Sequence, residues 1–287
     1  MRRMAESPLP VAAAGWQARL ALGFADDAGT TRLVERSHCG PLRVQKPLYP
    51  EGPRVCQAIV VHPPGGVAGG DELAIALRAG AGSAALVTTP GAGKWYKANG
   101  RHARQDVSIA VEDGASLEWL PQETIVFDAA DVHLGTEVTL GRGASYLGSE
   151  VLCFGRTASG ESFRSGTLAQ RTTVRSEGRL VWFEQGRLLA GSRAMHSPLG
   201  LAGKTVCATF LAAGSSVPAA LIAGLREQVA AALGDLPFGV SQLKSVVVAR
   251  VLCDSSEQAR AAMALVWHAL RPAFTGREAV TPRIWNT

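Results

Sequence analysis

One short pattern recurs along most of this sequence and limits what the chain can fold into. Glycine-containing turns at residues 80–83, 112–116, 141–145 and 176–179 each precede a strand-like run, with a spacing of roughly 30 residues. Glycine supplies the positive φ that lets the chain reverse tightly. Units of strand, turn and strand cannot bury both faces alone, but stacked units can. The pattern predicts a mainly β fold, with strands stacked as in a β-solenoid or β-helix over about residues 16–210.

Further strand-like runs precede this repeat. In residues 16–24 apolar and polar positions roughly alternate, which is the period of a half-buried strand. Residues 31–35 and 42–48 are shorter strands, and the continuous apolar run at residues 55–62 indicates burial on both faces. An ordinary antiparallel sandwich with regular turns is the alternative to a solenoid that these patterns leave open.

Helical signals appear only near the C-terminal end. Ser216 is the expected N-cap of a helix whose apolar positions recur at helical spacing and which ends at Gly234. Ser255 and Gln258 form a capping-box pattern for a second helix, which Pro272 is expected to stop. An apolar strand lies between the two helices. These elements are too few for a separate core, so we expect them to pack on the β body.

The expected domain organisation follows from these segments. Residues 1–14 are expected to be a mobile N-terminal arm, and residues 15–287 a single domain that includes the helices and strand of residues 216–271. The uncharged run at residues 205–225 is broken by Gly and Pro at 214–218, which indicates strand, turn and helix start instead of a membrane span. Acidic and proline residues also interrupt any signal-like segment at the N-terminus.

Composition excludes several classes of function. Charged residues make up 18% of the chain and the net charge of +5 comes from scattered arginines, so we expect no nucleic-acid partner. The five cysteines include no Cys-x-x-Cys pair, which argues against a disulfide framework or a structural zinc site and fits a reducing cytoplasm. At 47% hydrophobic residues the chain can fill a full core.

The glycine-rich runs do not form a nucleotide site. Residues 65–70 do not fit Gly-x-Gly-x-x-Gly, and no strand–helix unit follows them. The run at residues 91–94 is like the end of a phosphate loop, but Thr88 stands where glycine is needed and Trp95 where serine or threonine is needed. No Gly-x-Ser-x-Gly nucleophile elbow is present either.

A set of carboxylates is the strongest candidate for chemistry. They lie at or near strand ends or turns in apolar contexts, so stacked repeats would place several along one side of the body. A buried row of carboxylates is costly unless it is hydrated, paired or bound to a cation, and a water-filled channel or metal path would compensate. Alternatively, each carboxylate caps a turn or pairs with a nearby Arg or Lys. The five residues are Asp71, Glu123, Asp128, Glu150 and Glu184.

Histidines add borderline ligands for a divalent transition metal, although their spacing carries no metal signature. They are His62, His102, His133 and His196.

Three blocks in order resemble those of the urease accessory protein UreD family, also called UreH. They read HPPGGVAGGD (62–71), TTPGAGKWY (88–96) and LEWLPQETIVFD (117–128). The resemblance extends from Trp16 to residues 282–285 and so covers nearly the whole chain. Lys97 departs from it, because the family commonly has arginine there; the charge is kept and the planar fork is lost.

The resemblance implies a fold and a role. It implies a β-helical body with helices packed on it, and a cytoplasmic metallochaperone scaffold without turnover. It implies binding to the urease apoprotein and to UreF, which recruits the GTPase UreG, for delivery of nickel to urease. Nickel would be in transit, with no permanently bound cofactor. A channel proposed for the family would map here onto the five carboxylates, which as oxygen ligands hold nickel loosely enough to release it.

Two readings of other classes remain beside this one. A β-solenoid enzyme acting on a polysaccharide would use paired carboxylates, but it would want an exposed groove rich in aromatic residues, which here total only 6%. A purely structural solenoid would not explain the glycine-rich turn that ends at Asp71.

Overall fold

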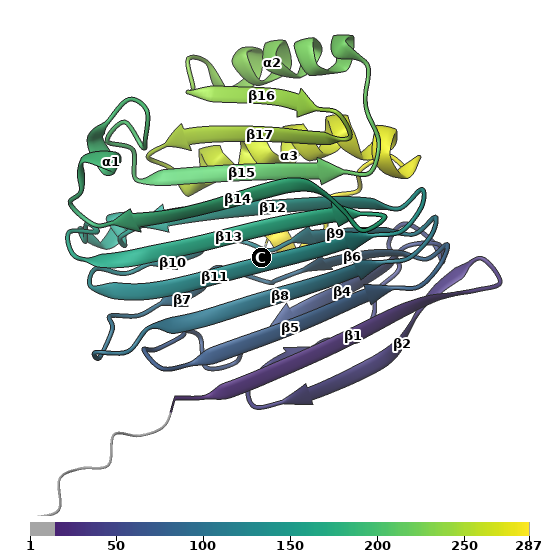
Figure 1. Ribbon diagram of the computed structural model, residues 1–287, viewed down its shortest axis with the longest axis horizontal. Helices are drawn as coiled ribbons and strands as arrows, with labels where there is room; N and C mark the ends of the chain where they lie inside the picture. The colour runs from purple at the N-terminus through teal and green to yellow at the C-terminus, as the bar shows by residue number, and fades with distance from the viewer. Residues whose placement is uncertain (1–14, 287) are drawn as a thin grey trace, which may run out of the picture.

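Two stacked β-sheets form most of the molecule in this computed structural model, which describes residues 15–286 (Figure 1). The expected mobile arm at residues 1–14 lies outside the described residues. The seven-stranded sheet has the order β14-β13-β11-β8-β5-β1-β2. Its strands are β1 (Gln17–Asp27), β2 (Thr30–Cys39), β5 (Glu72–Ala79), β8 (Ala103–Val111), β11 (Ala130–Leu140), β13 (Gly166–Ser176) and β14 (Arg179–Leu189).

The ten-stranded sheet lies behind it and is longer. Its main order is β16-β17-β15-β12-β9-β6-β4-β3, and two short strands, β7 and β10, attach beside β12. The strands are β3 (Arg43–Val44), β4 (Cys56–Val61), β6 (Ala84–Thr88), β7 (Gly93–Trp95), β9 (Ser116–Leu120), β10 (Thr124–Val126), β12 (Ser145–Phe154), β15 (Val206–Ala213), β16 (Phe238–Leu243) and β17 (Val246–Cys253).

The chain winds between these sheets as a solenoid. From β5 to β13 successive long strands alternate between the two sheets, and neighbours within each sheet run parallel. Antiparallel pairs, such as β1 with β2 and β13 with β14, occur at the ends of the stack. The sequence-based prediction of a β-solenoid is therefore confirmed over an ordinary antiparallel sandwich.

The repeated glycine turns stack as the sequence predicts. Gly82, Gly114 and Gly143 occupy equivalent turns of successive coils with φ values of 69°, 66° and 65°. Gly82 N donates to Asp113 O at 3.1 Å, and Gly114 N donates to Arg142 O at 2.9 Å. A residue with a Cβ would be strained at these φ values, so glycine is what allows the turns to align.

Two hydrophobic clusters hold the layers together. The first fills the space between the two sheets and includes Leu20, Leu77 and Ile109. The second lies between the ten-stranded sheet and the helices, and includes Phe210 and Trp267. The helical part therefore packs on the β body, as the sequence predicts. No helix among residues 15–286 is long and apolar enough to cross a membrane.

The helix ends differ in part from the expectations. Gln258 N donates to Ser255 Oγ at 3.3 Å, which confirms the predicted cap of α3 (Ser256–Thr275). The prediction of Ser216 as N-cap is wrong, because α2 (Ala219–Leu233) follows Pro218 and has no side-chain cap. Pro272 does not stop α3 either: it stands in the last turn, where only one carbonyl loses its donor. The remaining short helices are η1 (Thr157–Ser159), α1 (Arg193–His196) and η2 (Arg283–Asn286).

A buried ionic network fastens α3 to the solenoid. Arg271 is fully buried, and its guanidinium contacts Glu118 of β9 at 2.9 Å and Glu51 at 2.6 Å. Trp267 Nε1 donates to the second oxygen of Glu118 at 2.6 Å. The network links residues far apart in sequence and fixes the helix against the sheet that carries the candidate site.

Candidate functional site

The three glycine- and carboxylate-bearing blocks lie side by side at one corner of the solenoid. Val67 N donates to Lys94 O at 2.8 Å, which joins the first block to the second. Gly93 N donates to Glu123 O at 2.8 Å, which joins the second block to the third. Blocks about 30 residues apart in sequence therefore become neighbouring turns of successive coils.

Close packing explains the glycines in the first block. A Cβ on Gly66 would lie 2.2 Å from the ring of Tyr96, and a Cβ on Gly69 would lie 2.6 Å from the carbonyl oxygen of Arg101. Any larger residue would push the first block away from the second. Gly66 and Gly69 are required for this corner to close, which is a structural role and not a phosphate-binding one.

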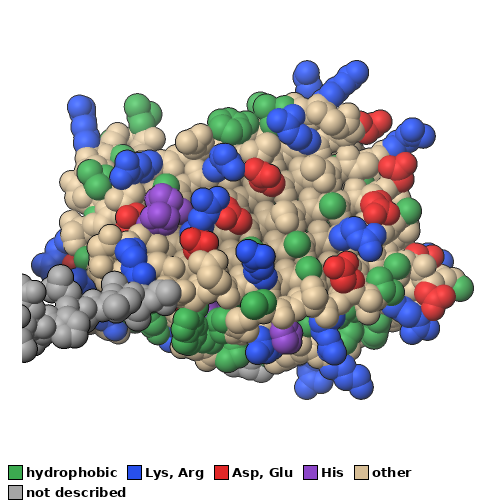
Figure 2. All heavy atoms as spheres, turned by 60° about the horizontal axis from the view of Figure 1, so that its bottom comes forward, with side chains coloured by type: hydrophobic (Ala, Val, Ile, Leu, Met, Phe, Trp, Pro, Cys, Tyr) green, Lys and Arg blue, Asp and Glu red, His purple; other side chains and the backbone are tan. Residues whose placement is uncertain are grey.

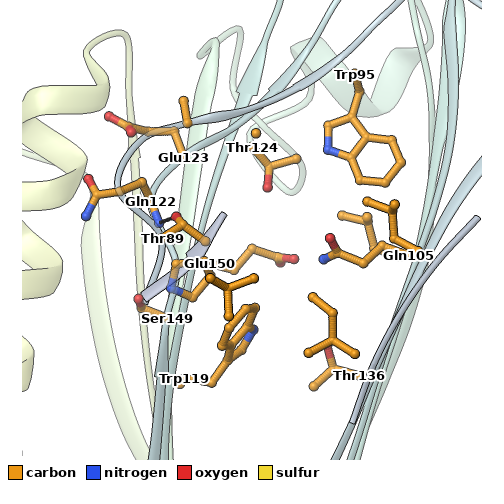
Figure 3. Close-up of a pocket in the computed structure, with 18 of the residues that line it drawn as sticks. Thr89, Trp95, Gln105, Trp119, Gln122, Glu123, Thr124, Thr136, Ser149 and Glu150 are labelled. Atoms are coloured by element: carbon orange, nitrogen blue, oxygen red, sulfur yellow. Dashed lines mark hydrogen bonds between the residues drawn. The ribbon is translucent and has the colours of Figure 1, made fainter. Parts of the chain in front are cut away.

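A cavity of about 270 Å³ lies between the sheets next to this corner (Figure 3). Its walls combine aromatic rings with polar side chains that point inward from both sheets. The aromatic residues are Trp95, Trp119, Tyr146 and Trp182. Glu184 stands at the edge of the cavity, and His62, Lys94 and Glu123 belong to the corner. The polar side chains of the interior are Gln105, Thr136, Glu150, Gln170, Thr172 and Thr209.

Glu150 is the central group of the cavity. It comes from β12, and its carboxylate points across the cavity toward Gln105, above the indole of Trp119 (Figure 3). Gln170 Nε2, from β13 of the opposite sheet, donates to Glu150 Oε2, so this hydrogen bond bridges the two sheets. Burial raises the pKa of Glu150 to about 7, because the Gln170 hydrogen bond only partly opposes it and nearby Glu184 adds to it.

Glu184 marks the second acidic position in the cavity wall. It lies on β14, and Arg250 of β17 pairs with its carboxylate. The side chains are 36% and 46% exposed, so this pair stands where the cavity wall meets solvent. A carboxylate inside the cavity is therefore followed by one at its edge.

Glu123 belongs to the corner and not to the cavity interior. Its carboxylate points away from the cavity toward α3 (Figure 3), where Arg260 Nε lies 2.9 Å from Glu123 Oε1. With its side chain only 11% exposed, the ion pair ties the third block to the helix.

Asp71 and Asp128 act as turn anchors and do not line the cavity. Asp71 accepts hydrogen bonds from Trp16 N and Ala68 N, both at 2.8 Å. Asp128 accepts from the backbone N–H groups of Arg164 and Ser165 at 2.8 Å, and these bonds, led by that of Ser165, lower its pKa. Both carboxylates thus have the turn-capping contacts that the alternative reading expected. Their assignment to an ion path stays a prediction without a contact to support it.

The histidines are dispersed. His62 stands at the corner, where burial lowers its pKa despite the charge of Asp71. His102 and His133 stack with ring centroids 4.5 Å apart, and His196 belongs to α1. No group of three or more His, Cys, Asp or Glu residues in the described part of the chain is arranged to hold a metal ion.

Two buried polar atoms in the cavity wall have no hydrogen-bond partner in the described part of the chain. They are Nε2 of His62 and Nε1 of Trp182. Buried polar groups normally find a partner in the protein or in ordered water. The cavity is therefore suited to hold water or another polar guest, which a purely structural core would not need.

Sequence reasoning missed Gln170 and the arginine partners of the carboxylates. A signal for Gln170 exists, because the inward positions of β13 read Leu168, Gln170, Thr172 and Val174, and two polar residues interrupt an apolar row. No comparable signal marks Arg250 or Arg260. Their roles depend on strands and helices that meet only in the folded chain.

The comparisons with known proteins agree with this architecture. The family described as UreD urease accessory protein matches residues 17–286. A urease accessory protein UreD from Janthinobacterium sp. (strain Marseille) is 59% identical over 271 residues, covering 94% of this chain and 92% of the relative. Another from Nitrosospira multiformis is 54% identical over 272 residues, covering 94% of this chain and 98% of the relative. This chain therefore belongs to the family of UreD urease accessory proteins.

Proposed function

We propose that this protein is a non-catalytic maturation factor that acts in the cytoplasm and helps deliver nickel to the active site of urease. In this proposal it binds the urease apoprotein and UreF, through which UreG joins the assembly. Nickel passes through the cavity between the two sheets as cargo and is not retained as a cofactor. The observation that carries the proposal is the carboxylate of Glu150, which stands inside the cavity with a glutamine as its partner and forms no ion pair with an arginine, lysine or histidine among residues 15–286.

Glu150 and Glu184 provide the electrostatic part of the path. A divalent cation in a cavity with low-polarity walls needs negative charge close by, and two carboxylates in succession supply it. Amide and hydroxyl oxygens from Gln170, Thr172 and Thr209 add weak neutral ligands. At about 270 Å³ the cavity also has room for several waters, so the ion can keep part of its hydration shell.

The ligand types suit transfer better than storage. Nickel binds imidazole and thiolate more tightly than carboxylate, amide or water oxygen. The interior of the cavity presents mainly oxygen ligands, and His62 stands at the corner away from Glu184. A cation that reaches Glu184 displaces Arg250, which is half-exposed and can move into solvent. The net charge at the edge of the cavity therefore changes little while the cation passes, because the cation takes the place of the guanidinium beside Glu184.

The geometry argues against a polysaccharide-active enzyme. Trp95 and Trp119 face the interior of the cavity (Figure 3) and are buried, so a sugar polymer cannot stack on them. A volume of about 270 Å³ is at the low end for even a small ligand. A purely structural solenoid is also disfavoured, because an apolar residue would stabilise the core more than Glu150 does.

The test uses cells that express urease and all its accessory genes in medium with nickel. Glu150→Gln keeps the shape of the side chain and its bond to Gln170 but removes the charge, and Glu184→Gln removes the second charge. Glu137→Gln, on the outward face of β11 beside Arg171, is the matched control. Urease activity and nickel per urease should fall with the first two variants and not with the control, while the accessory complex still co-purifies with urease. Full nickel loading with both cavity variants would overturn the proposed path, and full loading in cells without this gene would overturn the delivery role.

A further inference from the structure

Three of the four outer edges of the two sheets are protected against pairing with another strand. The edge strand β3 is only two residues long. At β16, α2 lies alongside (Figure 1) and Arg226 Nη2 donates to the carbonyl oxygen of Val240 at 2.6 Å. The edge strand β2 carries exposed charges of both signs, including Arg32, Glu35 and Arg36. Short length, a covering helix and charged side chains are the usual ways in which proteins blunt a sheet edge.

The fourth edge, β14, is neither short nor covered by a helix, and its one carboxylate, Glu184, is already paired with Arg250. It is 11 residues long and pairs only with β13. Ala190 N donates to Gly166 O at 3.0 Å, and because residues of an antiparallel pair alternate, the backbone groups of Phe183, Gln185 and Arg187 point away from β13. Among residues 15–286 no backbone hydrogen bond satisfies these three N–H groups.

The side chains of β14 are unusually apolar for an exposed edge. Leu180 is 52% exposed, and Phe183 and Leu189 are each 55% exposed. On β2 only Val34 is comparable, and it stands among charged residues. Figure 2 brings the β1–β2 end forward and shows acidic and basic side chains interspersed there. Large apolar side chains on an open edge favour contact with another protein.

Unpaired positive charge accompanies this apolar strand. Several arginines of the seven-stranded sheet have a carboxylate partner: Arg32, Arg78, Arg104 and Arg171. Arg175, Arg179 and Arg187, at and beside β14, have no ion pair with any described residue. Arg175 shares a shallow hollow with Leu180 and Phe183 on the outer face. Glu177 in the turn between β13 and β14 and Glu137 in the hollow are the nearby acidic residues, but neither forms an ion pair with these three arginines, which can therefore pair with acidic groups of a partner.

The ten-stranded sheet provides a floor beside this edge. It continues past β14 with β15, β17 and β16, whereas the seven-stranded sheet ends there (Figure 1). On the face of β17 that carries Arg250, Val248 and Leu252 are half-buried, and Leu243 of β16 is 53% exposed. A strand added to β14 would cover these side chains.

We propose that β14 is a docking strand, to which an extended segment of a partner protein adds as the next strand of the seven-stranded sheet. The segment carries acidic residues that face Arg175 and Arg187, and apolar residues that pack on Phe183 and on the floor formed by β17 and β16. A second copy of this chain is disfavoured as the occupant, because it would bring the same arginines together. The proposal concerns assembly, and its tests read out partner binding and not nickel transfer.

The experiment measures hydrogen–deuterium exchange in the complex isolated through a tag on this chain, from cells that co-express urease and its accessory proteins. The amides of Phe183, Gln185 and Arg187 should exchange on the order of tenfold more slowly than the outward-pointing amides of β2 in the same sample, because only the former gain hydrogen-bond partners. Exchange at β14 as fast as at β2 would overturn the proposal.

Two variants test the same contact by different means. Gln185→Pro removes a backbone N–H that forms no hydrogen bond within the fold. The variant should therefore release the partner, while the amides of β13 should still exchange slowly. Gln185→Thr, which keeps the N–H, is its control. Arg187→Glu should weaken the complex on the order of tenfold, and the remaining affinity should depend less on salt, because Arg175 still faces the acidic segment. Arg36→Glu on β2 is the control. Retention of every partner by both Gln185→Pro and Arg187→Glu would refute the docking strand, and so would a homodimer of this chain held through β14.

Discussion

Glu150→Gln should make the folded protein more stable at neutral pH while it impairs nickel transfer. The pKa of Glu150 is about 7, compared with an ordinary value of 4.5. Between these two values the folded state holds a proton that the unfolded state has released, so stability falls as pH rises. Glutamine has the same shape, can still bond to Gln170 after an amide rotation, and does not ionise. The stability gained by the substitution should therefore grow with pH.

The size of the effect follows from the gap between the two pKa values. Each pH unit of that gap is worth about 1.4 kcal/mol, so the carboxylate of Glu150 costs about 3 kcal/mol at pH 7.5 or above, where it is mostly ionised. At pH 5 the cost is only about 1 kcal/mol, because the folded state is still protonated. Glu150→Gln should thus gain about 2 kcal/mol relative to the parent between pH 5 and pH 7.5, or about 4 to 8 °C in Tm.

Urea titrations at the two pH values, followed by tryptophan fluorescence, measure this difference in the free energy of unfolding. Glu137→Gln is again the control, because its carboxylate is 62% exposed and solvent screens it. A Glu150→Gln effect that is the same at pH 5 and pH 7.5 would refute the reasoning. It would mean that cavity water solvates the carboxylate as well as bulk water does.

Two further predictions concern the framework of the site. Glu118→Ala leaves the guanidinium of Arg271 buried with only Glu51 as a carboxylate partner, so urea denaturation should show a loss of about 3 to 5 kcal/mol; a loss below about 1 kcal/mol would contradict a clamping role. Asp71→Ala and Asp128→Ala each leave two backbone N–H groups without acceptors, so each should cost about 1 to 3 kcal/mol in the same assay, and parental stability of either variant would contradict its turn-anchoring role.

The repeat could be predicted from the sequence because its signals are local. Glycine at 82, 114 and 143 meets a backbone requirement of the turn itself, and strand alternation shows which residues face inward. The helix limits could not be predicted to the residue, because a proline in the last helical turn, such as Pro272, leaves one carbonyl without a donor and the helix continues past it. Ser216 has the residue type of a cap, yet the helix begins beyond it.

The candidate site could be predicted only in part because its residues meet through the winding of the chain. Glu150 and Gln170 lie in consecutive strands of the solenoid but in different sheets, and neither position alone indicates a partner across the cavity. Asp71 and Glu184 look alike in the sequence as carboxylates near strand ends. Only the fold shows that one binds backbone N–H groups and the other pairs with Arg250.

The partners of the carboxylates differ in a way that fits transfer. Glu123 and Glu184 each have an arginine, whereas Glu150 between the sheets has only the neutral Gln170. A resident arginine beside Glu150 would balance its charge and remove the reason for a cation to enter. An apolar residue there would stabilise the core but leave no ligand. The raised pKa of Glu150 means that its carboxylate is only partly ionised near neutral pH, and a cation can take the place of its proton. Under the proposed path, the protein thus gives up stability at a position where a passing ion needs charge.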